Sequence, residues 1–302
     1  MKAIQFSEFG GPEVLELVEL PDPSPAAGQI RVRVRAVGIN PIDWKVRSGM
    51  MGGDLPRRTG VEMAGVVDEL GEGVTDVAVG DEVFGSAGGA AAELALAGFY
   101  APIPPTLDFV AAAALPVAVE TAERTLNLLG VGEGQTVLIN GASGSVGVAA
   151  VQFARERGAR VIGTAGAANA EYLRSFGAEP TTYGDGLVDR VRALAGGRDP
   201  VVDRALDAAG GGVLPALIEL TGSPEHVVTI ADFPGAQQTG ATFSGGSDEN
   251  RAWSALRDAS ALIAAGRLSV PVAQTFSLAE IGEAHRVSET GHPRGKLVIT
   301  VP

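Results

Sequence analysis

The chain has 302 residues, more than one compact hydrophobic core usually holds, so we expect two domains. Its formal net charge of -13 disfavours general binding to nucleic acids and to anionic membrane surfaces. The absence of cysteine excludes disulfides, thiolate catalysis and cysteine-ligated zinc. No apolar stretch reaches the ~18 residues of a membrane-spanning helix, and residues 1–6 have the pattern of a strand, not of a signal peptide. We therefore expect a cytoplasmic protein that binds neither nucleic acid nor a membrane.

Short strands punctuated by glycine and proline are predicted before residue 115. Residues 30–37 alternate with period two, with valines on one face and arginines on the other. A packed valine face opposite a solvated arginine face explains this pattern better than a polyanion site. Further strands are predicted at 14–20, 61–70 and 79–84. Together these segments indicate an irregular, barrel-like β module.

Strands and helices alternate from about Val119 onward, which is typical of a doubly wound parallel sheet. The predicted strands are 137–139, 160–164, 205–211 (ending in a glycine turn) and 227–231. The predicted helices are 148–157, 168–176, 187–194 and 214–220. After this sheet we expect two helices, 251–265 and 279–289, and a last strand at 296–301.

A glycine turn follows the first of these strands and opens the first helix. It is a G-x-G-x-x-G pattern with Ala142 in the first position, then Gly144 and Gly147. Glycines let the backbone approach a pyrophosphate, whose charge is stabilised by the helix N-terminus. An ordinary glycine-rich turn is the alternative, but the surrounding strand–helix–strand pattern favours dinucleotide binding. The residues expected to hold the pyrophosphate are Ser143, Gly144, Ser145, Val146 and Gly147.

Several motifs spread over nearly the whole chain carry a family resemblance. They are residues 36–45 (AVGINPIDWK), 64–67 (AGVV), 80–85 (GDEVFG), 113–116 (AALP), the 141–147 loop and 291–296 (GHPRGK). With these motifs the sequence resembles the medium-chain dehydrogenase/reductase superfamily, specifically its zinc-free, zeta-crystallin-like quinone oxidoreductase branch. The resemblance implies a GroES-like catalytic domain at 1–118, completed by 262–302, a Rossmann domain at 119–261, and a homodimer.

Zinc is not expected. Zinc-dependent relatives place a cysteine where this chain has Asn40 and a histidine where it has Val61. Asp43 and Glu62 alone do not make the usual nitrogen and sulfur site. The three histidines, His226, His285 and His292, share no short metal-binding spacing.

The expected cofactor is NADPH, with NADH as the weaker alternative. NAD-binding domains place an acid at the end of the second strand, but residues 163–170 contain none. The cation that often pairs with a 2′-phosphate is also missing from this turn, and Arg174 is interpreted as exposed. The residues expected near this phosphate are Thr164, Ala165, Asn169 and, by the resemblance, Tyr183.

The resemblance also implies the residues nearest the chemistry. Asn40 would orient the nicotinamide or the substrate, Trp44 would lie beside it, and Lys45 would donate a hydrogen bond at the rim of the cleft. The alternatives are an ordinary turn at Asn40-Pro41, a Trp44 ring that only packs, and a Lys45 that is simply solvated. Thr121 would lie near the nicotinamide, although its neighbour Glu120 departs from the usual apolar residue. The other implied cofactor contacts are Ile230, Phe243, Ser244 and Lys296.

The leading functional hypothesis is therefore a zinc-independent, NADPH-dependent reductase of quinones or α,β-unsaturated carbonyl compounds. A 2-enoyl-thioester reductase is the alternative enzyme, but only Arg47, Arg57 and Arg58 suggest a basic patch for a long acyl carrier. A non-catalytic NADPH-binding sensor or structural protein is the alternative from another class.

Overall fold

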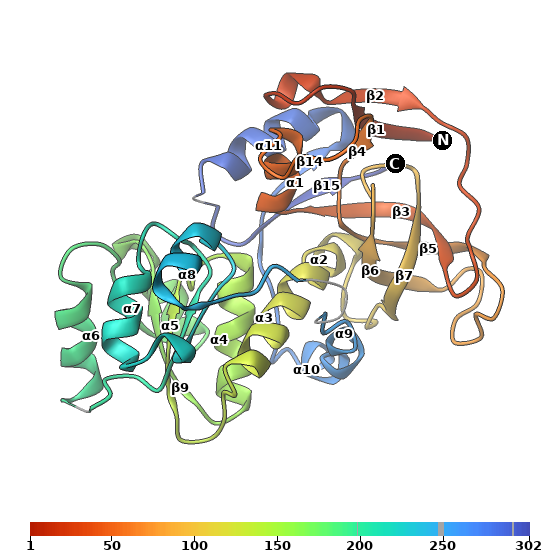
Figure 1. The fold of residues 1–302 in the computed structure, drawn as a ribbon. Helices are drawn as coiled ribbons and strands as arrows, with labels where there is room; N and C mark the ends of the chain where they lie inside the picture. The colour runs from red at the N-terminus through yellow and green to blue at the C-terminus, as the bar shows by residue number, and fades with distance from the viewer. Residues whose placement is uncertain (198, 247–250, 292) are drawn as a thin grey trace. The chain divides into compact units, whose positions relative to one another are not determined.

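The computed structural model describes residues 1–197, 199–246, 251–291 and 293–302 (Figure 1). These residues form two compact units. The first consists of Met1–Val117, Trp253–Gly266 and Val270–Pro302, and the second of Ala118–Ala252 and Arg267–Ser269. Among the described residues, none of the helices combines the length and the apolar character needed to cross a membrane.

Two sheets form the β part of the first unit. The smaller is antiparallel, in the order β2-β1-β4, with bounds Glu16–Glu19, Lys2–Phe6 and Arg57–Arg58. The larger has the order β14-β15-β3-β5-β6-β7, with bounds Val272–Ser277, Lys296–Thr300, Ile30–Ile39, Glu62–Leu70, Glu82–Ala87 and Leu94–Pro102. Strand β3 also pairs with β7, so β3, β5, β6 and β7 close into a ring. This arrangement confirms the predicted barrel-like, GroES-like module.

Strand β3 shows how the sequence produces this ring. Val32 and Val34 are completely buried, as the period-two pattern predicts. On the other face, Arg31 and Arg33 each donate a hydrogen bond of 2.7 Å to Asp68 of the neighbouring strand β5. The arginines are therefore a solvated face with cross-strand ion pairs, and the interpretation against a polyanion site is consistent with this geometry.

The helices of the first unit are short. They are α1 Pro41–Arg47, α2 Phe109–Ala113, α9 Ala255–Asp258, α10 Ser260–Ala264 and α11 Ile281–Glu289, with 3-10 turns at Pro12–Val14 and Leu278–Glu280. The single helix predicted at 251–265 is wrong, because the chain instead forms α9 and α10. The backbone N–H of Ala252 donates to the Glu120 carboxylate at 3.0 Å, and the Ser260 hydroxyl donates back to the Leu256 carbonyl at 3.0 Å. The Ser260 bond competes with the backbone bond that a regular helix would make to the same carbonyl.

The segment that forms α9 and α10 also differs from the expected domain division. The sequence assigns residues 253–261 to the Rossmann domain, whereas in the structure they belong to the first unit. Trp253 stacks on Phe99 of β7 with ring centroids 5.7 Å apart, and Arg257 forms an ion pair with Asp76. The remaining domain boundaries stay a prediction.

The second unit is a parallel six-stranded sheet in the order β10-β9-β8-β11-β12-β13. The strands are Glu179–Thr181, Arg160–Thr164, Thr136–Asn140, Arg204–Asp207, Val227–Thr229 and Thr242–Phe243. The helices are α3 Pro116–Leu128, which starts in the first unit, α4 Ser145–Glu156, α5 Ala170–Ser175, α6 Leu187–Ala195, α7 Leu214–Thr221 and α8 Phe233–Thr239, with 3-10 turns at Ala167–Asn169 and Pro224–His226. The central strand β8 is buried along its whole length, as expected for a parallel sheet. The order confirms the predicted doubly wound fold, in which ligands bind at the carboxyl ends of the strands.

Candidate active site

The glycine turn lies between strand β8 and helix α4. Gly141 has φ +79, a conformation that favours glycine, and it starts the turn. A Cβ at Gly147 would lie 2.2 Å from the carbonyl oxygen of Gly141, so only glycine lets the helix approach the strand this closely. A Cβ at Gly144 would meet only the Gly141 oxygen, at 3.6 Å. The space at Gly144 is therefore open, unlike that at Gly147.

The first turn of α4 offers backbone donors at this open space. Its first intrahelical bond runs from the Val148 N–H to the Gly144 carbonyl, at 2.9 Å. The preceding N–H groups, from Ser145 to Gly147, have no intrahelical acceptor, and the N-cap Gly144 has no side chain to supply one. Free N–H groups and the positive end of the helix dipole make this position suitable for a phosphate. The predicted residues 143–147 thus have the geometry of a pyrophosphate cradle.

Four buried polar side chains join the carboxyl ends of four adjacent strands. The Thr164 hydroxyl on β9 donates to Asn140 Oδ1 on β8 at 2.6 Å. Asn140 Nδ2 donates to Asp207 Oδ1 on β11 at 2.9 Å, and the Thr229 hydroxyl on β12 donates to Asp207 Oδ2 at 2.7 Å. Asn140, Asp207 and Thr229 were not among the predicted site residues, although each is the last residue of its observed strand. This ladder fixes the edge where the cofactor is expected.

Thr164 has a different place from the one predicted. It is fully buried, its proton is used by Asn140, and its oxygen accepts the Gly141 N–H at 3.1 Å. Its hydroxyl therefore supports the glycine turn and has no proton left to donate to a phosphate. Ala165, the next residue, is also buried.

The end of β9 brings together three of the polar residues considered for the cofactor. The Asn169 amide lies 3.5 Å from the Ser143 hydroxyl, at the limit of a hydrogen bond. Tyr183 is 58% exposed, and its hydroxyl lies 3.9 Å from the position that a Cβ at Gly166 would take. Arg174 is paired with Glu171 one helical turn away. The turn is thus polar and without an acid, and Arg174, the arginine considered for the 2′-phosphate, is already paired.

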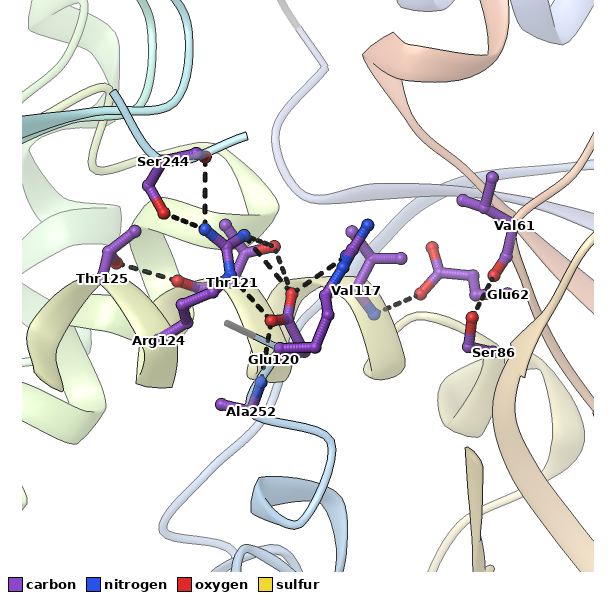
Figure 2. A network of polar contacts seen from close by, with 11 residues as sticks. Val61, Glu62, Ser86, Val117, Glu120, Thr121, Arg124, Thr125, Ser244 and Ala252 are labelled. Carbon is purple, nitrogen blue, oxygen red and sulfur yellow. Dashed lines mark hydrogen bonds and ion pairs between the residues drawn. The ribbon is translucent and has the colours of Figure 1, made fainter. Parts of the chain in front are cut away.

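Helix α3 carries a second network, drawn in Figure 2. Glu120 is completely buried and accepts hydrogen bonds from Arg124 Nε at 2.7 Å and from the Ala252 N–H at 3.0 Å. The Thr121 hydroxyl donates to the same carboxylate at 3.2 Å, and Arg251 forms an ion pair with it at 3.3 Å. Glu120, which stands where relatives have an apolar residue, is therefore the centre of a hydrogen-bond and ion-pair network.

Arg124 extends this network to Ser244. Its guanidinium donates to the Ser244 backbone oxygen at 3.2 Å and also to the Ser244 hydroxyl (Figure 2). Two residues predicted to contact the cofactor, Thr121 and Ser244, are thus held by one buried ion pair. Two further implied contacts belong to the same unit: the Ile230 N–H donates to the Asp207 carbonyl, and the ring of Phe243 packs edge-on against Phe233 with centroids 5.1 Å apart.

The first unit contains a cluster of four buried side chains: Asn40, Asp43, Glu62 and Lys296, with exposed fractions of 4%, 4%, 0% and 1%. Lys296 Nζ lies 2.5 Å from both Asn40 Oδ1 and Glu62 Oε1. Asn40 Nδ2 donates to Glu62 Oε1 at 2.7 Å. The predicted cofactor contact Lys296 is therefore enclosed, and its ammonium is committed to this cluster.

Backbone groups complete the cluster. Asn40 is the N-cap of α1, where its own N–H donates to Asp43 Oδ2 at 2.7 Å, and Asp43 Oδ1 accepts the Gly60 N–H at 3.2 Å. Glu62 Oε2 accepts the Val117 N–H at 2.7 Å (Figure 2). Burial raises the pKa of Asp43 to about 7, opposed by the Asn40 N–H and supported by the charge of Glu62.

Trp44 and Lys45 lie on α1 outside this cluster. Both are partly buried. Trp44 Nε1 is buried and has no hydrogen-bond partner among the residues that the structure describes, and the Lys45 ammonium lies 5.7 Å from the centroid of the Trp44 ring. An orphaned indole N–H is a group that a bound ligand could satisfy.

The residues at the position of the catalytic zinc in relatives do not fit a zinc ion. Glu62 and Asn40 are bonded to an ammonium, and the Val61 carbonyl accepts the Ser86 hydroxyl at 3.2 Å (Figure 2). Within residues 1–197, 199–246, 251–291 and 293–302, no three His, Cys, Asp or Glu side chains are grouped as metal ligands. His285 is buried against Arg47, and His292 lies outside the described residues.

Comparisons with known proteins agree with this geometry. The family model "alcohol dehydrogenase GroES-like domain" matches residues 26–101, and the model "zinc-binding dehydrogenase" matches residues 182–299. The quinone oxidoreductase of Mus musculus is 34% identical over 246 residues, which cover 76% of this chain and 73% of that protein. The chain belongs to the quinone oxidoreductase family. It is thus an oxidoreductase of the medium-chain dehydrogenase/reductase superfamily, as its motifs predict.

Solved structures of this family cover the whole chain. The quinone oxidoreductase of Coxiella burnetii is 33% identical, with a TM-score of 0.86 over 100% of this chain and 99% of that chain. A mycobacterial protein complexed with NADPH is 28% identical, with a TM-score of 0.84 over 100% of both chains. By sequence, the matched region spans between 53% and 73% of the length of several curated quinone oxidoreductases.

Proposed function

We propose that this protein is an NADPH-dependent reductase of quinones or α,β-unsaturated carbonyl compounds that works without zinc. The observation that carries the proposal is the open space at Gly144, beside the unpaired N–H groups that start α4. The quinone oxidoreductase relatives and the NADPH complex of a mycobacterial neighbour support it. NADPH, when bound, supplies the hydride. The protein therefore has to bind and orient the cofactor and the substrate, and to exclude water from the site.

The preference for NADPH over NADH rests on the end of β9. No carboxylate between residues 163 and 170 would repel a 2′-phosphate, and Asn169, Ser143 and Tyr183 offer neutral donors there. Because Arg174 is paired with Glu171, we expect a modest preference and no strict exclusion of NADH.

On the substrate side, we assign the orienting role to Asn40. Hydride addition to a quinone or enone leaves negative charge on a carbonyl oxygen, which a preorganised N–H donor stabilises. Asn40 Nδ2 has two N–H groups, and Glu62 accepts one of them. Trp44, with its orphaned N–H, and Lys45 would border the same substrate.

The alternative of an enoyl-thioester reductase has less support. One of the three arginines that suggested a basic patch, Arg47, is buried and paired with Glu289. Arg57 donates to the Gly52 carbonyl at 2.8 Å. A long anionic carrier would thus find little free positive charge among these residues.

Stopped-flow oxidation of NADPH tests the proposal, with a benzoquinone, an enone and a crotonyl thioester as acceptors and NADH as the competing donor. We expect turnover with the first two acceptors and a lower kcat/KM with NADH. Turnover should persist after dialysis against a zinc chelator, with less than stoichiometric zinc by elemental analysis. Tight NADPH binding without turnover of any acceptor would favour a sensor, and preference for the thioester would favour the alternative enzyme.

We also propose a homodimer, as the family resemblance implies, located in the cytoplasm, as expected from the sequence. The exposed rings of Phe233, on α8, and Phe243, on edge strand β13, pack on each other and offer an apolar surface for a second copy. Light scattering after size exclusion should give twice the chain mass, and Phe243→Asp should lower it; a wild-type monomer would refute the dimer.

A further inference from the structure

The buried cluster of the first unit places the Lys296 ammonium between Asn40, which stands where zinc-dependent relatives have a cysteine, and Glu62. Two carboxylates, one amide and one ammonium are enclosed with exposed fractions of 4% or less. Removing charges from water is costly unless each finds a partner. Here Lys296 pairs with Glu62 at 2.5 Å, and each oxygen of Asp43 accepts a backbone N–H.

Two glycines make room for this cluster. A Cβ at Gly38 would lie 2.3 Å from Glu62 Oε1 and 2.5 Å from the Ala113 carbonyl oxygen. Gly295 has φ +105, and a Cβ there would lie 2.2 Å from the Pro271 carbonyl oxygen, immediately before Lys296. The backbone is thus adapted on both sides to bring the ammonium and the carboxylate together.

The partners of Asn40 determine which way its amide faces. An ammonium only donates hydrogen bonds, and a carboxylate only accepts them. Lys296 therefore requires the oxygen Oδ1 on its side, at 2.5 Å, and Glu62 requires the nitrogen Nδ2 on its side, at 2.7 Å. Exchanging oxygen and nitrogen would place two donors together and two acceptors together. The amide is therefore locked in one of its two orientations.

We propose that Lys296 is a positioning residue that takes the place of a metal cation: it fixes and polarises the Asn40 amide so that its free N–H faces outward from the cluster as a donor. The proposal rests on the role assigned to Asn40 above. A positive charge on Oδ1 withdraws electrons from the amide and strengthens the remaining N–H donor. The acceptor it suits is a carbonyl oxygen that gains negative charge, as in a quinone or enone.

The variants must separate positioning from folding. Lys296→Met alone leaves buried carboxylates without a cation, so the double variant Lys296→Met/Glu62→Gln is used as well, because it removes both charges together. The side-chain amide introduced by Glu62→Gln can present either its oxygen or its nitrogen, so it no longer forces one orientation of Asn40. Arg31→Met breaks an ion pair with Asp68 elsewhere in the same unit and is the matched control.

Kinetics give the first readout. We expect kcat to fall about 10- to 100-fold in the double variant, with the Kd for NADPH within about threefold of wild type. Asn40→Ala should lower kcat strongly in wild type and by less than about threefold in the double-variant background. Arg31→Met should lower only the melting temperature. Equal effects of Asn40→Ala in both backgrounds would overturn the proposal.

A spectroscopic readout works without turnover. The chain has five asparagines, so selective ¹⁵N-asparagine labelling gives few side-chain signals, and Asn40→Ser identifies the one of interest. We expect a downfield, exchange-protected Asn40 amide in wild type that shifts and exchanges faster in the double variant. An unchanged amide would overturn the positioning role even if turnover fell. If the Asn40 amide signal shifts in the double variant but the wild-type protein turns over no acceptor, the proposed function is refuted while the locked amide is supported.

Discussion

The carbonyl oxygen of Gly141 lies 2.2 Å from the position that a Cβ at Gly147 would occupy. Helix propensity alone would make Gly147→Ala stabilising by up to ~1 kcal/mol. The close approach makes the substitution destabilising instead. We expect the free energy of unfolding to fall by about 1–3 kcal/mol, because α4 and the glycine turn must move apart to admit the Cβ. Denaturant titration measures it. Gly132→Ala, where a Cβ meets nothing within 4 Å, is the control; equal stability of both variants would refute the packing argument.

Gly144→Val should give the opposite combination of effects. Its Cβ would meet only one atom, at 3.6 Å, so the fold should persist with an unchanged melting temperature. The branched side chain would fill the space over the unpaired N–H groups of α4. We expect the Kd for NADPH to rise at least about 100-fold, or ~2.7 kcal/mol, by fluorescence titration. Retained affinity would show that the cofactor does not bind at this turn.

Glu120→Gln should lower the stability of the second unit, because it leaves the buried Arg124 guanidinium without its carboxylate partner. Arg124 is 5% exposed and would keep its charge without a carboxylate, which costs about 3–5 kcal/mol. Because Thr121 and Ser244 are bonded to this pair, the KM for NADPH should rise as well. Thermal melts and initial rates test both effects.

The control for Glu120→Gln is Arg192→Met, which breaks the exposed ion pair with Glu219 and should cost less than ~1 kcal/mol. The double variant Glu120→Leu/Arg124→Met should recover much of the stability, because the buried Arg124 charge is removed together with its carboxylate partner. A Glu120→Gln protein as stable as wild type would mean that the network does not hold the loop ends.

The glycine turn was predictable because its signal is local. Strand β8, the turn and α4 follow one another within residues 136–156, and each has its own pattern. Helix α1 was missed although its signal is equally local: Asn40 caps it, proline follows and Asp43 completes a capping box. The Asn40-Pro41 pair was interpreted only as a turn, which these residues also favour.

The polar clusters could not be predicted, because their members are distant in sequence. Lys296 and Asn40 are 256 positions apart, and their contact depends on β15 pairing with β3. Likewise, Arg251 and Ala252 contact Glu120 only in the folded chain, 131 and 132 positions away in sequence. Periodicity identifies which face of an element is buried, but it does not identify its polar partners.

His285 gives a prediction for pH. It is completely buried on α11, where Arg47 of α1 donates toward its Nδ1 at 3.4 Å and Glu289 pairs with the same arginine. Burial, and then the charge of Arg47, lowers the pKa of His285 from 6.5 to about 3. Between about pH 3 and pH 6.5, His285 is therefore protonated in the unfolded chain but neutral in the folded protein. Its stabilising contribution is present above pH 6.5 and is lost as the pH falls toward 3.

Between pH 7 and pH 5, this linkage should lower the free energy of unfolding by roughly 2 kcal/mol in the wild type. His285→Gln lacks the titrating group and should show a correspondingly smaller decrease. Asp43 acts in the opposite direction, because its pKa is raised to about 7 and protonation favours the folded state, but it does so in both proteins. The difference between the two denaturant series thus isolates His285. Parallel pH profiles would mean that the buried imidazole is protonated in the folded protein.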